Sequence, residues 1–147
     1  MGGMNPQRIL WLACAVLALA ACARKPDEQR LRETIAAMQT AVEQGKPRDF
    51  MASVAPDFTA NEGSVDHDGM ANILRVAALR NEKIGVTLGP IDVTLQGSRA
   101  TADVTATLTG GSGGLLPERG AIYAIHSAWK KDGSAWRVYS ATWEQRL

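Results

Sequence analysis

Residues 84–108, IGVTLGPIDVTLQGSRATADVTATL, decide the fold class of this chain. Apolar and polar side chains alternate in three segments of this stretch, at residues 84–88, 91–95 and 100–108. A period of two is typical of antiparallel strands that bury one face and leave the other in water. Gly89-Pro90 bends the chain after the first segment, and residues 96–98 turn it after the second. We therefore expect three strands here.

Two further strands are predicted at residues 121–130 and 136–144, joined by a turn at 131–134. The first of them is largely apolar on both faces: Tyr123, Ile125 and Trp129 alternate with Ile122, Ala124, His126 and Ala128. A strand that is apolar on both faces is covered on both, by a helix on one side and by a partner or ligand on the other. The pattern therefore predicts either a dimer or a pocket.

Helices are predicted before the strands. Apolar residues at helical spacing, Leu31, Ile35, Met38 and Val42, indicate an amphipathic helix over about 27–44, ended by Gly45 and Pro47. A shorter helical piece carries Phe50, Met51 and Val54 and is expected to stop before Pro56, followed by a brief strand at 58–60. A third helix should begin at the N-cap Asp66 and reach about Arg80, with Met70, Ile73, Leu74 and Ala77 on its apolar face.

Helices followed by antiparallel strands indicate an α+β fold, with N-terminal helices packed on a strongly curved antiparallel sheet of five or six strands. This order, the helix segment 68–74 and the closing segment Ser140-Ala141-Thr142-Trp143 resemble the nuclear transport factor 2-like superfamily, which includes the cone-shaped SnoaL-like proteins. The resemblance covers about residues 27–146. It implies a cavity at the wide end of a cone, which is enzymatic in some members and a binding pocket or an interface in others.

The N-terminus carries a secretion signal. Arg8 precedes an uninterrupted apolar run at residues 9–21, which as a helix spans roughly 20 Å, less than the roughly 30 Å of a bilayer core. Leu19-Ala20-Ala21-Cys22 resembles the lipobox of bacterial lipoproteins, which implies cleavage after residue 21 and acylation of Cys22. In such proteins an aspartate after the cysteine retains the protein in the inner membrane, so Ala23 implies the periplasmic face of the outer membrane.

We thus expect a cleaved signal peptide at 1–21, a lipidated tether at 22–28 that attaches the protein to the membrane through Cys22, and one domain at 29–147. Cleavage removes Arg8 and Cys14, which leaves 15 basic and 15 acidic side chains. A net charge near zero without a basic stripe argues against nucleic-acid partners. The remaining cysteine carries lipid, so no intramolecular disulfide is expected.

Asp66-His67-Asp68-Gly69 has the residue types of a metal or acid–base site, but an N-cap with acids that complement the helix dipole explains it better. An EF-hand would need glycine and glutamate where Ala71 and Ala77 stand. A closed zinc site is formed by four protein ligands. The chain offers two histidines and no free cysteine, so several carboxylates would have to complete such a site. We therefore predict no metal and no cofactor.

The segment 110–114, GGSGG, formally matches a nucleophile elbow, but the Leu115-Leu116-Pro117 that follows does not open the required helix. We interpret it as a flexible glycine-rich loop. Leu115 and Leu116 would either plug the core, which we favour, or close over a cavity as a lid.

Three residues would be catalytic if the chain were an enzyme: His126 or Asp103 as base and Tyr123 as hydrogen-bond donor. A hydrogen-bonded, half-buried His126 and a solvated Asp103 on the wet face are the favoured interpretations. Aromatic residues at strand spacing are usually core, which is the favoured interpretation of Trp129, Tyr139 and Trp143. The candidates for lining a pocket are Phe50, Phe58, Leu74, Tyr123, Trp129, Tyr139 and Trp143.

Two functional hypotheses follow. The first is a non-catalytic, lipid-anchored module facing the periplasm, whose cone cavity or outer sheet face binds a small apolar molecule, a protein or a second copy of the chain. The second is a small cofactor-independent isomerase or dehydratase that uses a His or Asp base in the cone cavity.

Overall fold

The computed structural model describes residues 25–80, 83–110 and 120–147. The predicted signal peptide, Cys22 and the glycine-rich segment with Leu115 and Leu116 therefore lie outside the described residues. The elements follow in the order α2 (Asp27–Glu43), α3 (Pro47–Met51), β1 (Val54–Ala60), β2 (Val65–Asp66), α4 (His67–Leu79), β3 (Gly85–Leu88), β4 (Asp92–Gln96), β5 (Arg99–Thr109), β6 (Ala121–Asp132) and β7 (Ala135–Gln145).

The two longer helices begin and end at the predicted local signals. Helix α2 starts after Pro26 and carries two acids in its first turn. Its C-terminus closes as a Schellman motif: Gly45 has φ 63°, its N–H donates to Val42 O, and the N–H of Lys46 donates to Ala41 O at 2.9 Å. At the start of α4, Asp66 Oδ1 accepts a hydrogen bond from the N–H of Gly69 at 2.7 Å. Asp66 is thus an N-cap, as predicted.

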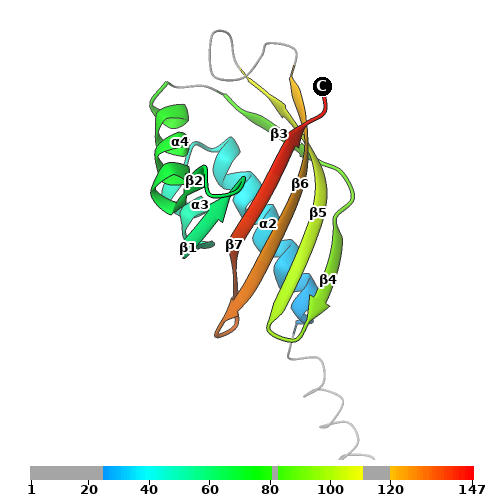
Figure 1. The fold of residues 1–147 in the computed structure, drawn as a ribbon. Coiled ribbons are helices and arrows are strands. Elements are labelled where there is room, and N and C mark those ends of the chain that lie inside the picture. The colour runs from blue at the N-terminus through cyan, green and yellow to red at the C-terminus, as the bar shows by residue number, and fades with distance from the viewer. Residues whose placement is uncertain (1–24, 81–82, 111–119) are drawn as a thin grey trace, which may run out of the picture.

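The strands form one seven-stranded curved sheet in the order β2-β1-β7-β6-β5-β3, with β4 also paired to β5 (Figure 1). The α+β class is confirmed, and three details differ from the prediction. The sheet has seven strands rather than five or six, because the two-residue strand β2 was not predicted. Strand β1 pairs with β7 in parallel, and β3 and β4 do not pair with each other but lie along successive parts of β5. The break between them falls at Gly89-Pro90, where the predicted bend occurs.

The prediction around Pro56 was wrong. Val54 is not helical: α3 ends at Met51, and β1 runs from Val54 through Pro56 to Ala60. Val54, Ala55, Phe58 and Ala60 are buried, so packing favours an extended chain over a helix. Proline has no N–H for the ladder, and the pairing of β1 with β7 shifts register between Val54 and Thr59, the interval that contains it.

The core lies between α2 and the face of the sheet that we call the inner face. Leu31 and Met38 of α2 pack with Ala100, Ala102, Trp129, Trp136 and Val138 of the sheet. Small residues on β5 leave room for the helix, and the large side chains of β6 and β7 fill the space beside it. Among the described residues, no helix is long and apolar enough to cross a membrane.

Polar atoms inside the core are satisfied. Ser127 is the only buried polar side chain in the described part of the chain; its hydroxyl donates to Ala102 O at 3.1 Å and accepts from Trp129 Nε1 at 2.8 Å. Trp136 is buried, and its Nε1–H donates to Asp27 O at 3.0 Å. The two indoles therefore fill the core without leaving an unpaired donor.

Replacing Leu31 tests the helix–sheet contact. Leu31 is 0% exposed, and we expect Leu31→Ala to lower the free energy of unfolding by about 2–5 kcal/mol through lost burial and a residual cavity. The measurement is urea unfolding of a chain that begins at Ala23. Leu79, at 78% exposed, is the matched control, and Leu79→Ala should change stability by less than about 0.5 kcal/mol. Equal losses in both variants would contradict this packing.

Candidate functional site

The sheet has a second face, which we call the outer face. In β6, Tyr123, Ile125, Ser127 and Trp129 point inward toward the helices, so Ile122, Ala124, His126 and Ala128 point outward. Within the described chain, α2 lies behind the sheet and α3 and α4 to one side, so no helix covers the outer face of β4 to β7 (Figure 1). Both faces of β6 are thus largely apolar, but the structure covers only one of them.

Strand register brings four polar residues into one row across this face. Asp92 pairs with Asp103, Asp103 with His126, and His126 with Thr142. His126 Nδ1 and Asp103 Oδ1 are 2.7 Å apart, a hydrogen bond that orients the imidazole. The side chains remain 53% and 58% exposed, respectively. His126 is thus hydrogen-bonded, as favoured from the sequence, but exposed rather than half-buried, while Asp103 is on the wet face.

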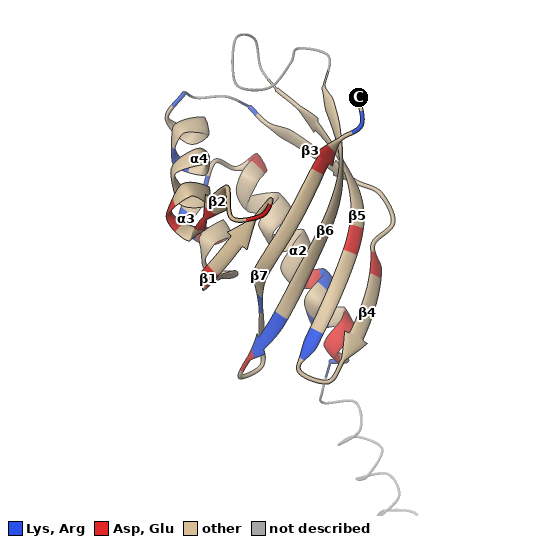
Figure 2. Cartoon of the chain, in the orientation of Figure 1, with Lys and Arg blue, Asp and Glu red and all other residues tan. Residues whose placement is uncertain are grey.

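The row lies in a hollow of about 430 Å³ on the outer face. Its lining residues are Pro90, Asp92, Asp103, Val104, Thr105, Ala124, Ile125, His126, Thr142, Trp143, Glu144 and Arg146. In Figure 2 acidic residues of β4, β5 and β7 colour this part of the ribbon red, and basic residues colour the lower ends of β5, β6 and β7 blue. Arg146 Nη2 lies 3.4 Å from Glu144 Oε2 at the edge of the hollow.

The hollow is suited to polar recognition. With Nδ1 bonded to Asp103, Nε2 of His126 is the ring nitrogen left to exchange hydrogen bonds with a partner, and Thr105 and Thr142 add hydroxyl groups. Three carboxylates disfavour a wholly apolar ligand because burying them would cost hydration energy. Among the described residues, no group of three or more His, Cys, Asp or Glu side chains is placed to hold a metal ion.

The proposed catalytic residues are divided between the two faces. His126 and Asp103 lie together on the outer face, whereas Tyr123 points inward, paired with Ala106. These three side chains therefore do not converge on one point, and neither His126 nor Asp103 lies inside the cone.

The seven pocket candidates are distributed over several places. Trp143 lines the hollow and also packs against the core, in which Phe58 and Trp129 are buried. Phe50 and Leu74 line a crevice of about 20 Å³ between α2, α3 and α4. Tyr139 lies on the outer face, with Arg99 Cζ 4.8 Å from its ring centre. Tyr123 is half-buried on the inner face, so the structure does not bring these candidates into one pocket.

Asp92, Thr142, Glu144 and Arg146 were not singled out from the sequence. The alternation of apolar and polar residues places Asp92 and Thr142 on the water-facing side of their strands. This alternation is the signal in the sequence that could have identified them. Their meeting depends on the register of β5 against β6, and the 11 residues between the ends of these strands, 110–120, are more than the two to five of a hairpin loop that would specify it. The sequence identified Asp103 and His126 as candidates, but it did not predict the contact between them.

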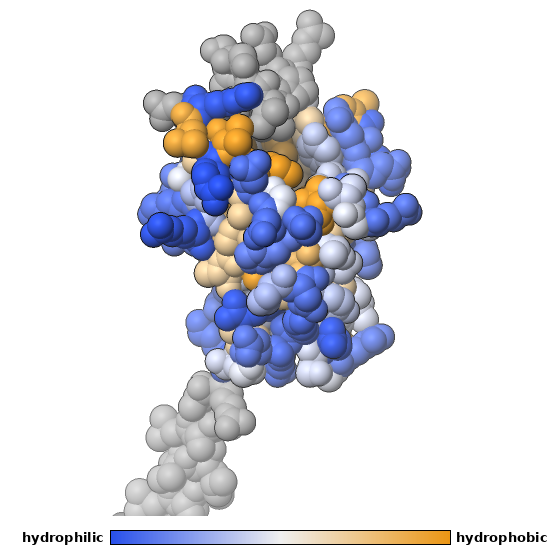
Figure 3. All heavy atoms as spheres, turned by 60° about the vertical axis from the view of Figure 1, so that its left-hand side comes forward, coloured by the Kyte–Doolittle hydropathy of each residue, from blue (hydrophilic) through white to orange (hydrophobic). Residues whose placement is uncertain are grey.

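A separate apolar surface lies on α4. No residue of this helix is buried, and Ile73 and Leu79 are 46% and 78% exposed. Figure 3 shows apolar side chains in the upper part of this side of the molecule, above a hydrophilic lower part. Among the described helices, α4 shares with α3 the absence of any buried residue.

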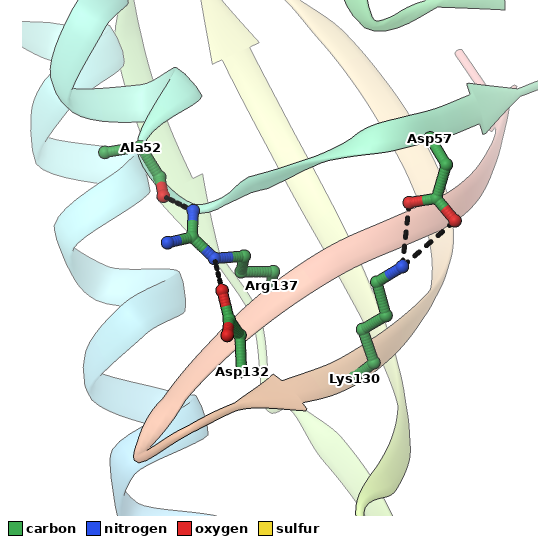
Figure 4. Close-up of polar contacts among 5 residues, drawn as sticks. All are labelled: Ala52, Asp57, Lys130, Asp132 and Arg137. Atoms are coloured by element: carbon green, nitrogen blue, oxygen red, sulfur yellow. Dashed lines mark hydrogen bonds and ion pairs between the residues drawn. The ribbon is translucent and has the colours of Figure 1, made fainter.

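Charged side chains tie β1 to the β6–β7 hairpin (Figure 4). Lys130 Nζ of β6 reaches over β7 to Asp57 of β1, at 2.8 and 3.0 Å from the two carboxylate oxygens. Arg137 of β7 donates from Nη1 to Ala52 O at 2.7 Å and from Nε to Asp132 Oδ2 at 2.9 Å. Asp57 lies between Val54 and Thr59, where the register of the β1–β7 ladder shifts. The Lys130–Asp57 contact therefore holds β1 to the hairpin where backbone pairing is interrupted.

Comparisons with known proteins identify the fold. No protein-family model matches the chain, and no curated protein matches it in sequence. A candidate dehydratase of the nuclear transport factor 2-like family from Streptomyces avermitilis superposes with a TM-score of 0.68 at 15% identity, covering 81% of this chain and 95% of that one. A nuclear transport factor 2-like protein with a cystatin-like fold from Novosphingobium aromaticivorans gives 0.63 at 18% identity, with 98% and 92% covered.

The Bdellovibrio bacteriovorus protein Bd1075 gives a TM-score of 0.69 at 10% identity over 80% of this chain. This chain spans 41% of the length of Bd1075, so the match concerns one part of a longer protein. Identities this low establish the fold and leave activity open. The chain therefore has the nuclear transport factor 2-like fold, as the resemblance in its sequence implied.

The Lys130–Asp57 contact makes a testable electrostatic prediction. The hydrogen bond from Lys130 holds the pKa of Asp57 below its ordinary value of 3.8. Because the folded-state pKa is depressed, Asp57 stabilises the fold above about pH 3.8 and loses this contribution as the pH falls through the lower folded value. We expect Lys130→Met to raise the pKa of Asp57 toward 3.8, measured by carbon-detected NMR titration of the carboxyl group.

Lys131→Met is the matched control, since Lys131 pairs with Asp27 and not with Asp57. This substitution should leave the pKa of Asp57 unchanged. An Asp57 pKa that is the same with and without Lys130 would show that the contact does not persist in solution.

Proposed function

We propose that this protein is a lipid-anchored, periplasm-facing binding and assembly module that works without catalysis and engages its partner through the outer face of its sheet. The anchor is supported by the lipobox-like segment ending in Cys22. The observation that carries the proposal is the outer face itself: four neighbouring strands, β4 to β7, present a hollow surface that no described helix covers.

The outer face is large enough for a specific protein interface. Strands β5, β6 and β7 have 11, 12 and 11 residues. Strand β4 adds five residues, so at roughly 3.3 Å per residue and 4.8 Å between strands the four strands present on the order of 600 Å². Standard interfaces bury roughly 600–1,000 Å² on each partner. The face therefore matches a protein partner better than a small molecule.

A second copy of the chain is the partner that fits best. On the middle strand of the outer face the apolar side chains of Ile122, Ala124 and Ala128 alternate with His126, whose strand neighbours are Asp103 and Thr142. Interfaces combine apolar contacts with polar groups, and two sheets pack through interdigitated side chains about 10 Å apart. A two-fold arrangement would use the same patch on both copies and would close as a dimer.

The other hypotheses find less support in the geometry. A small apolar ligand would meet Asp92, Asp103 and Glu144 in the hollow. An isomerase or dehydratase with its base inside the cone would need an acid or histidine there, whereas His126 and Asp103 lie outside. The dehydratase description belongs to the Streptomyces avermitilis protein, which shares this fold at 15% identity.

A bulky charge at the centre of the outer face should prevent dimerisation. Thr142 is exposed beside His126, and Thr142→Arg would place a large cation in the proposed interface. In sedimentation equilibrium we expect the parent chain, starting at Ala23, to be a dimer and Thr142→Arg a monomer. Ala37→Arg, on the exposed side of α2, is the control and should remain a dimer. A monomeric parent chain at high concentration would contradict the proposal.

Acylation and location are tested in cells that express the full chain. Cys22→Ser should abolish incorporation of labelled palmitate. The protein should then leave the membrane fraction, because it carries no acyl chain that could insert into the bilayer. Ala23→Asp should keep the lipid and move the protein from the outer to the inner membrane fraction. Palmitate incorporation that survives Cys22→Ser would exclude the lipobox assignment.

A further inference from the structure

The start of α2 and two turns of the sheet form one end of the molecule, which we call the tethered end: residues 25–27, the β4–β5 turn at 97–98 and the β6–β7 turn at 133–134 (Figure 1). Lys131 Nζ lies 2.7 Å from Asp27 Oδ2, and Trp136 Nε1 donates to Asp27 O. The N–H of Lys131 donates to Ser98 O at 2.9 Å. These contacts fix the beginning of the domain against both turns.

The proposed lipid attachment lies close to this end. Four residues, 23–26, separate Cys22 from the first residue of α2. A fully extended chain of this length spans at most roughly 14 Å. Helix α2 has 17 residues and extends roughly 26 Å from the tethered end. An acylated Cys22 would therefore hold the tethered end near the headgroups and leave the opposite end in solution.

Charge is divided along the same direction. Arg99, Lys130 and Arg137 occupy the tethered end of the outer face, while Asp92, Asp103 and Glu144 lie further along the strands (Figure 2). Asp103 is four residues from Arg99 along β5, roughly 13 Å. The basic end of the face is therefore the end next to the lipid.

Acidic partners neutralise part of this charge. Lys130 pairs with Asp57, Lys131 with Asp27, Arg137 with Asp132, and Lys25 with Glu33. Arg99 stacks on Tyr139 and has no ion pair with any described residue. Exposed pairs are weak, so such lysines can exchange a carboxylate for a phosphate at little cost. Arg99, which has no carboxylate partner to release, and Lys25, which can release Glu33, are the exposed cations best placed to bind a phosphate.

We propose that the tethered end is a lipid-docking surface on which Lys25 and Arg99 bind the phosphates of anionic phospholipid headgroups. This inference rests on the proposed acylation of Cys22. When the tethered end is docked, the strands stand at a steep angle to the membrane plane. The Asp103–His126 row then lies away from the bilayer. The outer face then points sideways along the membrane, where a second anchored copy can reach it.

The test uses the full-length, lipidated protein in vesicles of phosphatidylcholine and phosphatidylglycerol. Mass spectrometry of the purified protein first confirms the acyl chains on Cys22, which tests the anchor separately from docking. Cleavage removes Cys14, so a cysteine introduced at Ser98, Ser134 or Gln145 is the only free thiol for a fluorescent label. Gln145 ends β7 at the end opposite the β6–β7 turn.

Headgroup-attached nitroxide lipid should quench the labels at Ser98 and Ser134 several-fold more than the label at Gln145. Lys25→Gln with Arg99→Gln should lower the docked-to-undocked ratio on the order of tenfold or more, because each cation near an anionic surface contributes about 1 kcal/mol. The control pair Arg75→Gln with Arg80→Gln, on and just after α4, should leave quenching unchanged. Equal quenching at all three positions on acylated protein would overturn the docking surface, whereas protein without acyl chains would overturn the anchor.

Discussion

Packing of α2 against one face of the sheet is the contact on which the rest of the structure depends. Leu31 and Met38 fit against the small residues of β5, while Trp129 and Trp136 fill the space on either side of them. One amphipathic helix covers one face of a strongly curved sheet, so the opposite face remains uncovered among the described elements. The surface proposed to bind a partner is thus a direct consequence of how the core is built.

The two faces of the sheet differ in chemistry as well as in exposure. The inner face is apolar, and its one buried hydroxyl, on Ser127, is fully hydrogen-bonded. The outer face carries the Asp103–His126 contact, carboxylates at one end and cations at the other. Ionisable groups are tolerated there because water solvates them, and they give this surface the polarity that a specific interface needs.

Local signals in the sequence predicted much of the fold. Gly45 ends α2 and Asp66 caps α4 because such residues act on their immediate neighbours, and alternation located β3 to β7 within a few residues. The prediction was wrong at Val54, which was grouped with Phe50 and Met51 in a helix, because burial against the sheet favours an extended chain there. The parallel pairing of β1 with β7 was missed for the same reason, since it joins segments that are distant in the sequence.

The candidate site was only partly predictable. His126 and Asp103 were recognised separately, but their 2.7 Å contact depends on a register that no turn in the sequence specifies. Placing His126 inside the cone or outside it required knowing which face α2 covers. Residue type and alternation therefore identify the side chains, whereas tertiary packing decides which of them meet.

Burial of the outer face against a second copy can be measured directly through its histidine. The chain has two histidines that can be carbethoxylated: His126 lies in the centre of the outer face, and His67 lies at the start of α4. In a dimer formed through the outer face, His126 becomes protected as protein concentration rises, while His67 reacts at a constant rate. Unchanged reactivity of His126 from dilute to concentrated protein would contradict it.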